Sequence, residues 1–136
     1  MFTMMALLMP DAPDVTIEKL EQAVQTLFGR NPGFRLEYET LPHKKTRNLK
    51  LRWNNQWGMR LFSEAGTTAS NDAAEVARIL GKDAPAGLAA STRRVRAVFN
   101  DDPEEQYTDY MVEIMFMLEK IEGAVVFDPQ QNKIMD

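Results

Sequence analysis

Three short runs between residues 34 and 61 carry an apolar side chain at every second position, and this alternation constrains the fold more than any other feature. Apolar and mostly charged residues alternate over 34–38, 49–53 and 57–61. A period of two is typical of strands that bury one face and leave the other in water. The polar link 54–56 between the last two runs favours a β-hairpin. This region therefore predicts antiparallel strands with one wet face.

Segments of other kinds flank these strands. The run Phe2–Met9 is apolar without alternation, which suits a central strand covered on both faces. Thr16 is expected to cap a helix over 17–28, which Gly29 ends. The further expectations are a loop over 63–71, a short helix over 72–80, a loop over 81–91, a strand over 93–99, a long helix from Asp102 to about Glu122, and strands over 124–127 and 133–135.

This order of elements predicts the fold class. Helices that alternate with mostly antiparallel strands indicate an α+β domain, with a single sheet packed against two or three helices. The β-α-β-β start is compatible with an extended ferredoxin-like core. A chain of 136 residues favours a single domain over 1–136.

Composition excludes several kinds of site. The chain has no cysteine and one histidine, His43. Disulfide frameworks, thiol nucleophiles, zinc ribbons and multi-histidine metal sites are therefore excluded, and most triad chemistry is disfavoured. The acidic residues between Asp101 and Glu105 are explained by helix capping, so we expect no bound metal. We expect no cofactor either. With no catalytic constellation evident, we expect that the protein is not an enzyme.

The apolar start of the chain does not resemble a targeting signal. The run is eight residues long, no basic residue precedes it, and Pro10 follows. A membrane helix needs about twenty apolar residues, and a signal peptide needs a basic start. We therefore expect a cytoplasmic protein that does not associate with a membrane.

Basic residues are concentrated in the middle of the chain. Residues 42–62 hold six Lys and Arg and no acid, together with Trp53 and Trp57. Basic and aromatic residues together can bind single-stranded nucleic acid, which is the alternative function, using residues 44–60. However, both tryptophans fall on the apolar phase of their strands. The Lys and Arg side chains fall on the opposite phase, where they can pair with Glu37 and Glu39 across strands. The net charge of −4 also disfavours nucleic acid.

Acidic residues are concentrated near the end of the chain, on the expected last helix. Its inner face is predicted to consist of Tyr107, Tyr110, Met111, Ile114, Met115, Met117, Leu118 and Ile121. Val112 and Phe116 lie one turn apart on the opposite face, among charges. An apolar anchor with a charged rim is typical of a small protein interface. Another segment, such as the C-terminal tail, could instead cover Phe116.

The favoured function is therefore that of a module that binds another protein. Its predicted contact residues are Asp102, Glu105, Asp109, Val112, Glu113 and Phe116. A symmetric dimer through two acidic helices would meet like-charge repulsion, unless the acids meet the basic strands, so the oligomeric state stays open.

The layout resembles the small acidic α/β proteins that bacteria encode as immunity partners of toxins. The resemblance is architectural and rests on the opening strand and helix over 2–28 and on the closing helix and strand, 107–121 into Gly123–Pro129. It implies a non-catalytic protein that occludes the active site of a toxin domain. The acidic helix would then be the occluding element, with carboxylates in place of phosphates.

Overall fold

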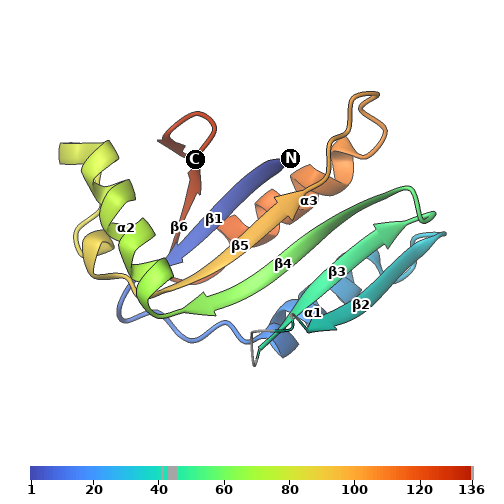
Figure 1. Ribbon diagram of the computed structural model, residues 1–136, viewed down its shortest axis with the longest axis horizontal. Helices are drawn as coiled ribbons and strands as arrows, with labels where there is room; N and C mark the ends of the chain where they lie inside the picture. Colours follow the sequence, from blue (N-terminus) through green and yellow to red (C-terminus); the bar gives the residue numbers. More distant parts are fainter. Residues whose placement is uncertain (41, 43–45, 136) are drawn as a thin grey trace.

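The protein forms one antiparallel sheet with helices on both faces (Figure 1). This computed structural model describes residues 1–40, 42 and 46–135. The strands are β1 (Phe2–Leu8), β2 (Phe34–Thr40), β3 (Arg47–Trp53), β4 (Trp57–Ala65), β5 (Arg93–Phe99), β6 (Ala124–Asp128) and β7 (Lys133–Ile134). The α-helices are α1 (Ile17–Phe28), α2 (Thr67–Leu80) and α3 (Thr108–Glu119), and 3₁₀ turns lie at Gly81–Asp83 and Leu88–Ala90.

The strands of the sheet are ordered β2-β3-β4-β5-β1-β6-β7. Strand β1 lies between β5 and β6, which α3 connects, as in a ferredoxin-like core. Three strands separate β1 from β2, so the core is extended on that side. The predicted α+β class with a single antiparallel sheet is confirmed, and so is the central position of the first strand.

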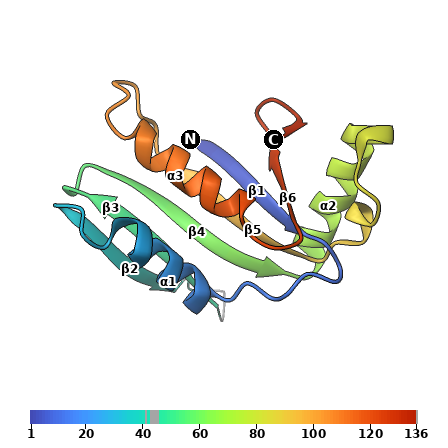
Figure 2. The ribbon, with the colours of Figure 1, turned by 180° about the vertical axis from the view of Figure 1, so that it is seen from behind.

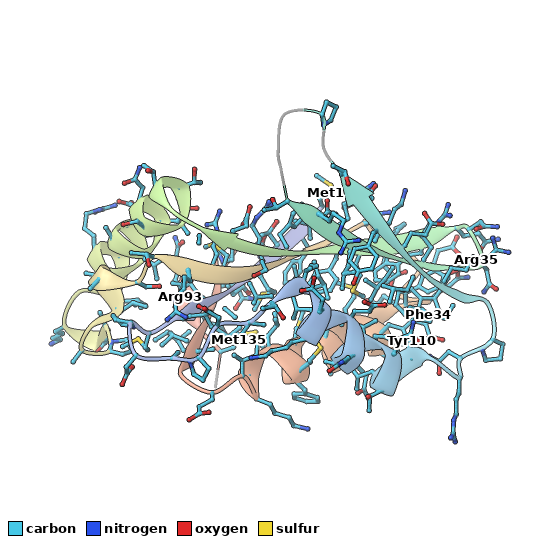
Figure 3. All side chains as sticks on the ribbon, turned by 90° about the horizontal axis from the view of Figure 1, so that it is seen from below. Met1, Phe34, Arg35, Arg93, Tyr110 and Met135 are labelled. Carbon is cyan, nitrogen blue, oxygen red and sulfur yellow. The ribbon has the colours of Figure 1, made fainter. Side chains whose placement is uncertain are left out.

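The two faces of the sheet are covered unequally. Helices α1 and α3 lie together over one face (Figure 2). Helix α2 lies on the other face at one end (Figure 3). There Ala73 and Val76 pack with Met5 and Leu7 of β1. We call the rest of that second face, over β2 to β5, the open sheet face. It is the wet face that the alternation predicts.

Helix α1 has the predicted bounds. The side chain of Thr16 accepts a hydrogen bond from the backbone N–H of Lys19 at 3.2 Å, which caps the first turn. Leu20, Val24 and Phe28 are buried against the sheet. One stripe of apolar residues is thus enough to dock the helix.

Aromatic rings attach α3 to the β3–β4 hairpin. Tyr110 stacks on Trp53 with ring centroids 4.6 Å apart, and Tyr107 stacks on Trp57 at 5.0 Å. Phe28 of α1 meets Trp53 edge to face at 5.0 Å. Such pairs add stability beyond the area they bury. This cluster therefore fixes the rotation of α3 about its own axis.

The predicted loop over 63–71 is wrong. Strand β4 continues to Ala65, because Glu64 and Ala65 pair with Arg94 and Arg93 of β5. Helix α2 then begins at Thr67 rather than at residue 72. The small residues of this segment suggest a loop, but Ala69 is buried and belongs to the helix.

The predicted start of the last helix is also wrong. Helix α3 begins at Thr108, not after Asp102, and it ends at Glu119 rather than near Glu122. Glu105 has a φ of 56°, a left-handed conformation that interrupts any helix there. The prediction that Asp102 caps this helix is wrong too, because the N-cap residue is Tyr107. The carboxylate of Asp102 accepts hydrogen bonds from the N–H groups of Gln106 and Tyr107, at 3.0 and 2.8 Å, in the turn before the helix.

Leu88 should anchor the long connection between α2 and β5. Its side chain is fully buried with Val76 and Phe127, in a segment that the sequence suggests has little to bury. We predict that Leu88→Ala lowers the free energy of unfolding by about 2–5 kcal/mol, because it leaves a cavity. Urea unfolding of both proteins tests this; a loss below about 0.5 kcal/mol would show that the anchor is dispensable.

Candidate protein-binding site

The outer face of α3 presents an apolar pair between acids. Phe116 is 52% exposed and Val112 is 37% exposed. Asp109 and Glu113 share this face, because residues three and four apart are neighbours on a helix. These four residues form the centre of the site, which we call the α3 surface.

The turn before α3 holds the remaining predicted contact residues. Glu105 is exposed at its tip. The carboxylate of Asp102 is half-buried and accepts bonds from two backbone N–H groups and, at 3.2 Å, from the hydroxyl of Thr108. Asp102 therefore shapes this turn, whereas Glu105 faces solvent at the start of the α3 surface.

The C-terminal tail, as far as Met135, leaves Phe116 exposed. Beyond β7, the backbone N–H of Met135 donates to the carbonyl of Val126 at 2.9 Å, so the described tail pairs with β6. Half of the Phe116 side chain remains exposed with the described residues in place. The residue thus keeps the exposure that the helical phase predicts.

A groove that could not be predicted from the sequence lies between α1 and the C-terminal half of α3. It has a volume of about 350 Å³. Leu20 and Ala23 line it from one helix, and Met117 and Ile121 from the other. Its two walls are about a hundred residues apart in the chain, and no local pattern shows that they meet.

The open sheet face carries the basic residues Lys50, Arg52 and Arg60, which pair with Glu37 and Glu39 as predicted. Lys44 and Lys45, which belong to the same predicted basic stretch, lie outside the described residues. Arg52 contacts Glu37, and Arg60 donates to Glu39 at 2.8 Å. Trp53 and Trp57 are buried on the other face, so the structure leaves them no surface on which bases could stack. Phe62 lies on the open face, but the guanidinium of Arg96 covers its ring at 4.2 Å.

A half-buried cluster of ion pairs lies on the open sheet face next to α2. Glu64 accepts hydrogen bonds from Arg94 at 3.0 Å and from Arg96 at 2.8 Å, and Arg94 is only 4% exposed. Burial opposes ionisation of Glu64, but the hydrogen bonds and charges of Arg96 and Arg94 outweigh it and hold its pKa below the usual value. For Glu39, hydrogen bonds from Arg60 and Asn48 likewise outweigh burial and lower the pKa.

The charged groups among the described residues that line the hollow near this cluster are paired with one another. The hollow has a volume of about 580 Å³ and is lined by Glu64, Arg93, Arg94 and several hydroxyls. Arg93 is paired with Asp14 at 2.7 Å and Arg94 with Glu64. A carboxyl with a lowered pKa is a weak proton donor or acceptor at neutral pH.

Comparisons with known proteins identify no relative: no known family, curated protein or solved structure matches this chain. Among the residues that the structure describes, no helix is both long and apolar enough to cross a membrane. Nor do three or more potential metal ligands gather at one point within the described ranges.

The two faces of α3 should respond differently to truncation. Leu118 is fully buried, whereas Phe116 is half exposed. We predict that Leu118→Ala costs about 2–5 kcal/mol of stability and that Phe116→Ala costs less than about 1 kcal/mol. Equilibrium unfolding of both variants measures this. Equal losses would mean that Phe116 is a core residue.

The ion cluster should make stability depend on pH. The pKa of Glu64 is lower in the folded protein than the ordinary 4.5, so its contribution is present above that value and is lost as the pH falls through the folded pKa. Between about pH 5 and about pH 3, wild type should therefore lose more stability than Glu64→Gln. Urea unfolding across this range measures both; parallel losses would remove Glu64 as the cause.

Proposed function

We propose that this protein is a non-catalytic module that binds another protein through the α3 surface. The observation that carries the proposal is the exposure of Phe116 beside Val112, between the carboxylates of Asp109 and Glu113. Interfaces derive most of their energy from a few apolar or aromatic anchors, and a polar rim keeps water away from them. The α3 surface has both parts.

The rigidity of α3 also favours binding. Tyr107 and Tyr110 stack on the tryptophans of the sheet, so Phe116 projects from a helix that cannot rotate. A pre-ordered anchor loses little conformational entropy when a partner covers it. The groove between α1 and α3 offers apolar surface for a side chain of the partner.

The charge of the α3 surface indicates the chemistry of the partner. Asp109 and Glu113 are exposed there, and Glu105 is exposed in the turn that precedes the helix. Such a surface attracts a basic partner and speeds the encounter. A toxin whose active site binds phosphates is such a partner, and the protein would then act as its immunity protein in the bacterial cytoplasm, with α3 in place of the anionic substrate.

A pair of matched variants tests this function. Phe116→Asp adds a charge to the α3 surface, and Ile79→Asp adds the same charge at a residue of α2 that is 38% exposed. We expect affinity capture from the native host to retain one protein with wild type and with Ile79→Asp. Phe116→Asp should retain at least about tenfold less, because a charged side chain disrupts an apolar anchor.

Circular dichroism controls for folding. If Phe116→Asp unfolds, Phe116 is core and the proposal loses its basis; Glu113→Lys then tests the rim independently. A protein retained equally by wild type and both Asp variants would place the binding surface elsewhere.

A further inference from the structure

Like charges face each other across strands of the open sheet face. Lys50 of β3 lies directly opposite Arg60 of β4, and Arg52 of β3 lies opposite Arg35 of β2. Residues directly opposite in antiparallel strands have Cβ atoms about 5 Å apart, and like charges there destabilise a sheet. Two such pairs on three adjacent strands therefore need a compensating charge.

The neighbouring acids compensate only in part. Glu37 contacts Arg52, and Glu39 contacts Arg60 and, at 4.0 Å, Lys50. Among the described residues, Arg35 has no carboxylate within ion-pair distance. Four cations against two carboxylates leave two net positive charges at this place.

A hollow opens between three of these cations. It has a volume of about 220 Å³ and is lined by Lys50, Arg52 and Arg60, and by the amide residues Asn55, Gln56 and Asn100. Gly58 lies in its floor, where the strand adds no side chain. A hollow of this volume has room for a polyatomic anion.

The donors of this hollow are not fully used. None of the described residues lining it is acidic. The Nε–H of Arg52 is buried, and no acceptor reaches it from the described part of the chain. A buried donor without an acceptor costs stability. An anion in the hollow would meet the donors of Lys50, Arg52 and Arg60 with no carboxylate among the described lining residues.

We propose that this hollow binds the phosphate group of a small phosphorylated molecule. A phosphate group brings three acceptor oxygens to the three cations that line the hollow, Lys50, Arg52 and Arg60, whereas a carboxylate brings two. Planar guanidinium groups bind phosphate through paired hydrogen bonds, and Lys50 adds a point charge. Trp57 also lines the hollow but is only 4% exposed, so recognition rests on the phosphate rather than on stacking.

Titration followed by NMR tests the site on the whole protein. We expect inorganic phosphate and ribose 5-phosphate to give saturable shifts of the amides of Asn55, Gln56, Gly58 and Asn100, in buffers of matched ionic strength. Lys50→Gln and Arg52→Gln should each raise the dissociation constant at least about tenfold, the cost of one charge-assisted hydrogen bond. Arg78→Gln, on the exposed side of α2, should leave it unchanged.

Three results would overturn the proposal. Shifts that do not saturate, or that chloride reproduces at equal ionic strength, would mean general screening. An unchanged dissociation constant in folded Lys50→Gln and Arg52→Gln would place the anion elsewhere. Affinity for oligothymidylate that rises with its length and falls steeply with salt would favour a nucleic-acid backbone over a small molecule. None of these results bears on the α3 surface.

Discussion

Stacking of two tyrosines on two tryptophans determines which side of α3 meets solvent. Tyr110 on Trp53 and Tyr107 on Trp57 bind the first turn of the helix to the β3–β4 hairpin. Helical geometry then places Ile114 and Leu118 in the core and carries the opposite side outward. The exposure of the α3 surface is thus a consequence of aromatic packing on the far side of the same helix.

The sheet separates two surfaces of opposite charge. Helices α1 and α3 cover one face (Figure 2). The carboxylates of Asp109 and Glu113 are exposed on the outer side of α3. The cations of β2 to β5 lie on the other face, which α2 covers only at one end (Figure 1). Alternation along each strand produces this separation, because apolar residues turn toward the helices and charged residues away from them. One molecule can therefore offer an anionic face and a cationic face to different ligands.

Most elements could be predicted from the sequence because each carries a local signal. The cap at Thr16 and the stripe that follows it determine α1, and the phase of α3 predicts the exposure of Phe116. The start of α3 could not be predicted, because the left-handed conformation of Glu105 competes with good capping residues. The like-charge pairs, such as Lys50 with Arg60, depend on strand register, and the groove between α1 and α3 depends on tertiary packing. Neither of these is a local property.

Site-specific crosslinking in living cells tests the central claim most directly. A photoreactive amino acid would replace Phe116 in one version of the protein and Ile79 in another. We expect one protein to be crosslinked from position 116 and not from position 79, because the partner covers the α3 surface. Adducts with the same protein from position 79, or adducts from position 116 only with many unrelated proteins, would contradict the account.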